Sequence, residues 1–224
     1  GESPTLSTAE KLRVVDLVVQ EANGKIPVMA GAGGYDTKSV VALAQDMVRV
    51  GVDGILSVAP YYNKPSPEGI YQHFCTVAEN LDCPVMVYNV PSRTGVNIAP
   101  DTLRRLASLP NIVGIKEASG NLGQISQICS DASDTFSVLS GDDEYALPMI
   151  AVGGLGVISV VSNETPSEMS ALVNAALEGD FATALSIHKR LLPLMQINFV
   201  ESNPIPVKAA LAEMGLLAAR FRLP

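Results

Sequence analysis

The chain repeats one pattern, in which a short continuous apolar run is followed by a stretch with helical spacing of apolar residues. Unbroken apolar runs, as opposed to alternating ones, are typical of parallel strands that are covered on both faces. We therefore predict strands at residues 26–30, 54–58, 84–89, 112–116, 136–140 and 155–160. The helices that follow them are predicted at residues 38–50, 68–81, 101–109, 122–130, 144–152 and 167–178.

Six β-α units in direct succession restrict the fold to a doubly wound sheet or a (β/α)8 barrel. The units repeat about every 20 to 30 residues without a linker, and this regularity favours the barrel. Six strands do not close a barrel with the usual shear, so we predict an α/β fold, a TIM barrel truncated at its N-terminus. After Gly179 only helices are predicted, at residues 181–200 and 206–217. The predicted division is a barrel portion at 1–178 and a C-terminal helical extension at 179–224, together effectively one domain.

The composition excludes several classes of protein. Hydrophobic residues make up 47% of the chain and charged residues 17%, so disorder is excluded. A net charge of -8 argues against nucleic acid and anionic membrane surfaces as partners, and no apolar run is long enough to span a bilayer. Three irregularly spaced cysteines indicate reduced thiols in a cytoplasmic protein, and two distant histidines make a metal site a poor expectation.

Local signals mark helix ends and turns. Ser7 stands three residues before Glu10, which predicts a capping box, and Thr165 is predicted to cap the helix that Pro166 begins. Asp142-Asp143 could be a carboxylate pair, but a helix N-cap is the favoured interpretation. The glycine-rich stretches at residues 31–34 and 153–156 lack the full dinucleotide-binding pattern and are interpreted as tight turns.

Lys116 is the sharpest candidate for chemistry, because it closes an apolar strand and barrel function collects at strand ends. A desolvated lysine has a lowered pKa and can attack a carbonyl to form a Schiff base; the alternative is a lysine paired with Glu117 or Asp142. Tyr88 ends the preceding strand, so it should neighbour Lys116 and could shuttle protons, unless it is an ordinary core tyrosine.

Two loops beyond these strand ends add further candidates. Arg93 follows Tyr88 in a turn-rich loop and could hold a substrate carboxylate, although by itself it could equally be a surface arginine. Tyr61 and Tyr62 suit either a site or an interface between subunits.

Four motifs resemble the 4-hydroxy-tetrahydrodipicolinate synthase (dihydrodipicolinate synthase) family, which belongs to the class I pyruvate-dependent aldolases and lyases. They stand in the same order and read YYNKP at residues 61–65, YNVPSRTG at 88–95, GIKEA at 114–118 and NPIPVK at 203–208. The resemblance extends from Gly1 to Pro224.

The resemblance implies a lyase of lysine (diaminopimelate) biosynthesis that needs no cofactor beyond a Schiff base between pyruvate and Lys116. It implies condensation of pyruvate with L-aspartate 4-semialdehyde to give 4-hydroxy-tetrahydrodipicolinate, in a homotetramer built as a dimer of dimers. Tyr88 corresponds to the family's proton donor and acceptor, and Tyr62 to a tyrosine that completes the neighbouring subunit's proton relay. The implied substrate-binding residues are Arg93, Ile158, Gly141 and Asn203.

The resemblance also implies departures from the family pattern. A Thr-Thr dipeptide that binds pyruvate, and two preceding strands, would stand before Gly1, so truncation is the expected explanation of the missing initiator Met, and an inactive or poorly folded fragment is expected. The family's lysine effector site would use Ser3, Pro4, Tyr35, Ser39 and Tyr61, with Thr8 and Lys11 nearby. Because sensitive members carry Asn and Glu in place of Tyr35 and Ser39, and His in place of Thr8 and Lys11, weak sensitivity to lysine is expected.

Two alternatives compete with this interpretation. A sister aldolase, of the N-acetylneuraminate or 2-keto-3-deoxy-sugar-acid type, would keep Lys116 and Tyr88 but would not be expected to carry Arg93 in its loop. A non-catalytic member that binds a small carboxylate would be free to lose Lys116, Tyr62, Tyr88 and Arg93, all of which are present.

Overall fold

The computed structural model describes residues 1–224, and strands and helices alternate along it as the sequence pattern predicts. The strands are β1 (Met29–Gly31), β2 (Gly54–Val58), β3 (Val85–Asn89), β4 (Ile112–Glu117), β5 (Ser137–Ser140) and β6 (Gly156–Val157). The helices are α1 (Thr8–Ala22), α2 (Thr37–Val50), α3 (Pro67–Glu79), α4 (Pro91–Thr94), α5 (Pro100–Leu106), α6 (Leu122–Asp131), α7 (Ala146–Ala151), α8 (Pro166–Leu177), α9 (Phe181–Ile197) and α10 (Ile205–Glu213). Two 3-10 turns, η1 (Ser3–Thr5) and η2 (Val161–Asn163), complete the list. An α/β fold with six strands is therefore confirmed.

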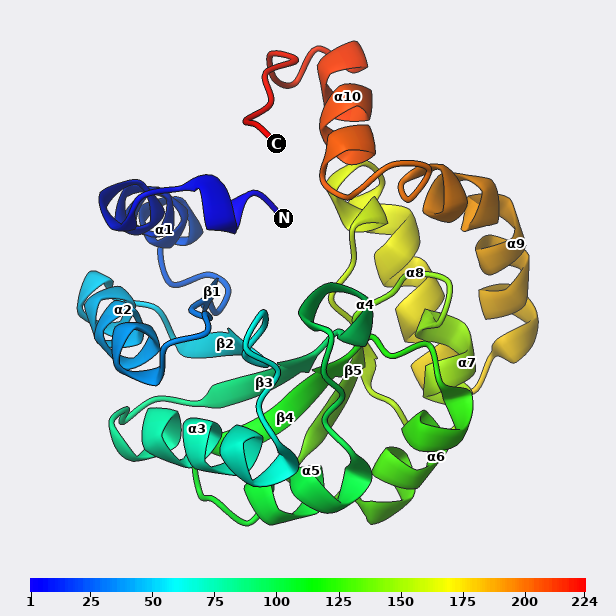
Figure 1. The fold of residues 1–224 in the computed structure, drawn as a ribbon. Coiled ribbons are helices and arrows are strands. Elements are labelled where there is room, and N and C mark those ends of the chain that lie inside the picture. Colours follow the sequence, from blue (N-terminus) through cyan, green and yellow to red (C-terminus); the bar gives the residue numbers. More distant parts are fainter. The chain divides into compact units, whose positions relative to one another are not determined.

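The chain divides into two compact units, and the first runs from Leu6 to Val138. Its strands β1, β2, β3 and β4 pair in chain order, and every pair is parallel. Helices α2, α3, α5 and α6 lie along the outer side of these strands, each in contact with the next (Figure 1). Short apolar strands that are covered by helices cannot leave backbone groups unpaired, and parallel pairing satisfies them.

The core of this unit lies between the strands and the helices. Ile55 of β2, Phe74 of α3, Val85 of β3 and Ile115 of β4 have no exposed surface. Each such side chain contributes about 1.5–3 kcal/mol by leaving water. The strand ends are thus held on a rigid, apolar base.

The second unit comprises Gly1–Thr5 and Leu139–Pro224. Within it β5 pairs with β6 in parallel, through Leu139↔Gly156 and Ser140↔Val157. One apolar cluster joins α7, α8 and α9, and its fully buried members include Leu172 and Met195. The predicted division into a barrel portion at 1–178 and a helical extension at 179–224 stays a prediction.

Several local predictions can be compared with the structure. Ser7 accepts the amide of Glu10 and the Glu10 carboxylate accepts the amide of Ser7, so the capping box is confirmed. Thr165 occupies the N-cap position of α8 but makes no side-chain cap hydrogen bond, so its predicted capping contact is wrong. None of the helices combines the length and the apolar composition that a membrane span needs.

The predicted capping role of Asp142-Asp143 is also wrong. Helix α7 begins later, after Tyr145, without a side-chain cap. The Asp143 carboxylate instead accepts the amides of Val160 and Val161 at 2.9 and 3.0 Å, and Asp142 accepts the amide of Glu144 at 3.1 Å. The two carboxylates therefore anchor loops and not a helix.

Candidate active site

Lys116 and Tyr88 lie side by side at the carboxyl ends of β4 and β3. They are direct partners in the strand register, and the Lys116 Nζ lies 4.2 Å from the centroid of the Tyr88 ring. Both side chains are half-buried. A positively charged lysine nitrogen, either an ammonium or the iminium of a Schiff base, is stabilised over an aromatic face at this distance. The prediction that the two residues are neighbours is confirmed.

Local sequence explains why the strand ends meet in this register. Beta-branched and apolar residues precede Lys116 in β4, and Gly114 interrupts them where β5 comes close. A Cβ atom at Gly114 would lie 2.4 Å from the carbonyl oxygen of Ser137, so no larger residue fits there without a shift of the backbone. Gly114 thus permits the close approach that holds the Lys116 strand in place.

Arg93 lies on the connection that leaves β3 beyond Tyr88. The sequence predicts a turn-rich loop, and the structure forms one helical turn there, α4, which ends at Gly95 with φ 72°. The Arg93 amide donates to the carbonyl of Val90 at 3.0 Å, and the side chain is exposed. Glycine accepts this left-handed conformation without strain, so Gly95 ends the turn that presents Arg93.

Three tyrosines gather on the loops after β1 and β2. Tyr35 packs edge-on against Tyr61 with 5.5 Å between ring centroids, and its centroid lies 6.4 Å from that of Tyr62. Tyr62 is 87% exposed and has φ 70°, an uncommon conformation for an aromatic residue. Its ring therefore projects from the surface of its own unit.

The effector-site prediction involves residues of both units. Tyr35, Tyr61 and Ser39 belong to the first unit, whereas Ser3 and Pro4 form η1 in the second. Ser39 lies in the first turn of α2, where its amide donates to the Asp36 carboxylate at 3.0 Å and its hydroxyl donates to the same oxygen. These bonds lower the pKa of Asp36, so this carboxylate is ionised and occupied by the helix cap.

The remaining predicted substrate-binding residues belong to the second unit. Gly141 is half-buried directly after β5, and Ile158 follows β6 with its amide donating to the carbonyl of Ser140 at 2.8 Å. Asn203 is half-buried and precedes a cis Asn203-Pro204 bond at the start of α10. Their contacts with substrate stay predictions.

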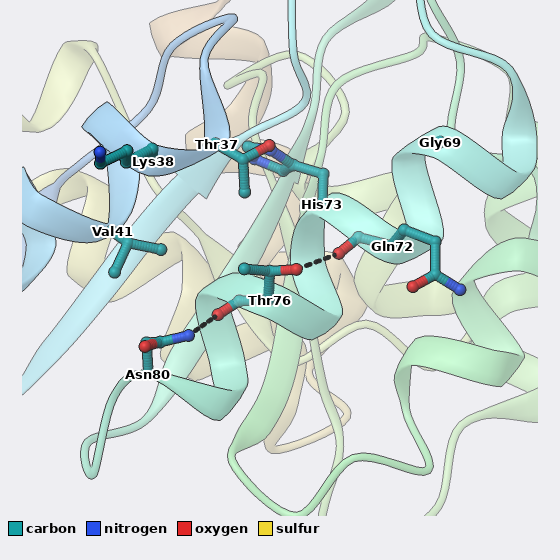
Figure 2. A pocket seen from close by; sticks show the side chains of 8 residues that line it. All are labelled: Thr37, Lys38, Val41, Gly69, Gln72, His73, Thr76 and Asn80. Carbon is teal, nitrogen blue, oxygen red and sulfur yellow. Dashed lines mark hydrogen bonds between the residues drawn. The ribbon is translucent and has the colours of Figure 1, made fainter.

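A separate groove of about 490 Å³ lies between α2 and α3, and Figure 2 shows the residues that line it. His73 is 5% exposed, and its Nδ1 forms a 2.9 Å hydrogen bond with the Thr37 hydroxyl. Burial lowers the pKa of His73 to about 4, so the imidazole is neutral at pH 7. Other polar groups in the groove bond along their own helix, as when Thr76 donates to the carbonyl of Gln72 (Figure 2). The groove presents no group activated for catalysis.

A buried polar cluster that was not predicted from the sequence lies next to Lys116 and Tyr88. Asn89 and Glu117, the residues that follow them, are 0% and 1% exposed and are bonded to each other at 2.9 Å. The signal that could have identified them is a polar residue one step beyond each strand-end candidate, since successive strand residues face opposite sides. No group of three or more His, Cys, Asp or Glu side chains is placed to hold a metal ion.

Comparison with known proteins places this geometry in context. A family model described as the dihydrodipicolinate synthetase family matches residues 1–224. The chain is 52% identical to a 4-hydroxy-tetrahydrodipicolinate synthase of Methanocaldococcus jannaschii and 50% identical to one of Koribacter versatilis. All of this chain aligns with them, and it covers 77% and 75% of their lengths.

Solved structures give the same result. The crystal structure of dihydrodipicolinate synthase from Aquifex aeolicus matches with a TM-score of 0.98 and 49% identity. That match covers 100% of this chain and 77% of the other. The similarity therefore covers both units, including the strands that carry Lys116 and Tyr88.

Proposed function

Because the chain belongs to the dihydrodipicolinate synthetase family, we propose that it condenses pyruvate with L-aspartate 4-semialdehyde to give 4-hydroxy-tetrahydrodipicolinate. This is a lyase reaction of lysine (diaminopimelate) biosynthesis. The observation that carries the proposal is the placement of Lys116 over the ring of Tyr88 at the ends of two paired strands.

Lys116 is the nucleophile of the reaction. Its neutral amine attacks the keto carbon of pyruvate, and loss of one water molecule leaves an imine between the lysine nitrogen and that carbon. Loss of a proton from the pyruvate methyl group gives an enamine. The enamine carbon then bonds to the aldehyde carbon of the semialdehyde, whose oxygen takes up a proton, and the imine to Lys116 is restored. The amino group of the former semialdehyde attacks the imine carbon and displaces the Lys116 amine, which closes the ring and frees the lysine.

Tyr88 is the group that moves protons during these steps. Its phenol can donate and accept, and the contact of its ring with the Lys116 Nζ keeps it beside the nitrogen at which water is lost. The aromatic face also stabilises the positive charge of the iminium. No other cofactor is needed, because the Lys116 nitrogen of the imine accepts the electron pair of the broken C–H bond. The same electron pair forms the new bond when the enamine attacks.

The other predicted residues bind and complete the site. Arg93 holds the carboxylate of the semialdehyde, since a guanidinium matches a carboxylate with two parallel hydrogen bonds. Ile158, Gly141 and Asn203 contact the substrates. Tyr62 completes the proton relay of a neighbouring subunit. Its 87% exposure supports a contact with a second copy of the chain.

We also propose the larger assembly that this site implies. The six strands are six of the eight strands of a TIM barrel, and the segment from 179 to 224 is its helical extension. The protein works in the cytoplasm as a homotetramer, in which Tyr62 of each subunit meets a second copy.

The test of the function is borohydride trapping. Incubation of a full-length version of the protein with pyruvate and borohydride is expected to leave a reduced pyruvyl adduct on Lys116, identified by peptide mass mapping, and K116A is expected to leave none. The exposed Lys38→Arg variant serves as the control and should be trapped like the unmodified chain. An adduct on a different lysine, or on none, would contradict the mechanism, and Tyr88→Phe should slow trapping without moving its position.

A further inference from the structure

Asn89 and Glu117 form a buried pair on the side of the strands opposite to Lys116 and Tyr88. They are partners in the β3–β4 register, one position beyond the Tyr88–Lys116 pair. Successive strand residues face opposite sides, so the active pair and the buried pair lie back to back on the same two strand ends. The buried pair is thus placed to organise the loops beyond these strand ends without contacting the substrates itself.

The Glu117 carboxylate is held by neutral donors alone. Its Oε2 accepts the Asn89 amide at 2.9 Å and that of Gln124 at 3.4 Å, while its Oε1 accepts the backbone amide of Ser119 at 2.6 Å. A carboxylate that is 1% exposed is costly to bury and is retained only where its hydrogen bonds are satisfied. Burial of this polar pair therefore costs free energy, whereas an apolar pair at the same position would suffice for packing.

Asn89 also closes the loop that carries Arg93. Its Oδ1 accepts the backbone amide of Ile98 at 3.0 Å, and its Nδ2 donates to Asn97 as well as to Glu117. One side chain at the end of β3 therefore binds the far end of the loop that begins at Val90. Asn97 in turn exchanges two hydrogen bonds with Gln124 of α6, at 2.8 and 3.1 Å.

We propose that Asn89 and Glu117 are positioning residues that fix the Arg93 loop against the strand of Lys116, and so set the affinity for the carboxylate of the second substrate. This inference rests on the proposed function. Thr94, in contrast, bonds within the loop, where its hydroxyl donates to the carbonyls of Val90 and Val96 and accepts the amide of Val96. Loss of the clamp loosens the loop that carries Arg93, while Lys116 stays on its paired strand.

The main variant is Glu117→Gln, which changes one oxygen into a donor. Whichever way the new amide points, its NH2 group faces a donor, either Ser119 or the Asn89 and Gln124 pair. We expect KM for L-aspartate 4-semialdehyde to rise about tenfold, a loss of about 1.4 kcal/mol of binding, with KM for pyruvate changed less than about twofold. Asn97→Ala, at an exposed position of the same cluster, should fold normally and raise the semialdehyde KM less.

Asn111 provides the matched control. Asn111 precedes β4, at the end of the strand opposite to Lys116. Its side-chain amide donates to the carbonyls of Ala78 and Leu81 at 2.8 and 2.9 Å. Asn111→Ala should lower the melting temperature without changing either KM. If the role of Glu117 is purely structural, E117Q should behave like Asn111→Ala, with a lower melting temperature and unchanged KM values. The proposal would therefore be overturned if E117Q and N97A kept the KM values of the unmodified protein for both substrates.

Trapping separates this proposal from the proposed function. If the unmodified protein forms the borohydride-stable adduct on Lys116 and E117Q forms it equally well, the proposed function stands. The KM values then decide whether Asn89 and Glu117 position the Arg93 loop. If unmodified protein forms no adduct, the function itself fails and the clamp fails with it. The exchange variant E117Q/Q124E, which returns a carboxylate to the cluster, should recover part of the lost semialdehyde affinity.

Discussion

At the scale of single residues, neighbours that alternate along a strand serve different purposes. Tyr88 and Lys116 face one side and share a contact of 4.2 Å, whereas Asn89 and Glu117 face the other and are buried. The first pair was predictable, because a lysine at the end of an apolar run is unusual. The second pair was not, because its meaning lies in partners such as Ile98 and Gln124, which only the folded chain brings together.

His73 makes stability depend on pH. Its pKa is lowered by burial to about 4, below the value of 6.5 in an unfolded chain, so the unfolded state binds the proton more readily. The stabilisation is present above pH 6.5 and is lost as pH falls toward 4, and it amounts to about 3 kcal/mol. We expect His73→Gln to flatten the decline in the free energy of unfolding over this range.

Urea denaturation between pH 4 and 7 measures this effect. His188 is the matched control, because burial also lowers its pKa but the side chain is only half-buried. His188→Gln should change the slope less than His73→Gln. An unchanged slope in the His73 variant would show that the imidazole is not the group that titrates.

At the scale of elements, the strand positions and the start of α1 followed local signals, while the start of α7 and the loops depended on tertiary partners. The capping box of α1 needs only residues within one turn, and the sequence predicts it correctly. Asp143 was predicted to cap a helix, but it accepts the amides of Val160 and Val161 at the start of η2, 17 and 18 residues later in the chain. No short-range rule identifies a partner at that separation.

Asp143 is expected to hold the connection between β6 and α8. Asp143→Ala removes the acceptor of two backbone amides, of which that of Val161 is buried, and should cost about 3 kcal/mol of stability, since a hydrogen bond to a charged group contributes about 1.5–3 kcal/mol. Asp143→Asn keeps one oxygen for these amides and should cost much less. Thermal unfolding of both variants is the measurement.

Asp142→Asn supplies the comparison for this prediction. Burial raises the pKa of Asp142, which shows that the folded state disfavours its charge, so the neutral amide should leave stability unchanged or improved at pH 7. Equal losses in D142N and D143A would mean that the two amides do not depend on Asp143.

At the scale of the whole molecule, the expected response to lysine draws on residues from both units. Ser3 and Pro4 belong to one unit, and Tyr35, Ser39 and Tyr61 to the other. Tyr35 fills its position with an aromatic ring packed on Tyr61, and Ser39 is bonded to the helix cap at Asp36. Neither offers a carboxylate to the ammonium group of lysine.

We therefore expect lysine to leave activity unchanged at concentrations that inhibit a sensitive family member. The coupled assay of the condensation, run with and without lysine, measures this. The double variant Tyr35→Asn and Ser39→Glu is the matched comparison and should gain sensitivity. Strong inhibition of the unmodified protein at low lysine concentrations would contradict the expectation.

The sequence alone determined the α/β fold, the order of the six strands and the pair formed by Lys116 and Tyr88. These features depend on local periodicity and on the rule that adjacent parallel strands end at the same edge. Only the tertiary structure decided the helical turn at Arg93, the anchoring by Asp143 and the clamp of Asn89 and Glu117. Each of these depends on which backbone amides a polar side chain meets after folding, and such pairings between distant residues leave no periodic signal in the chain.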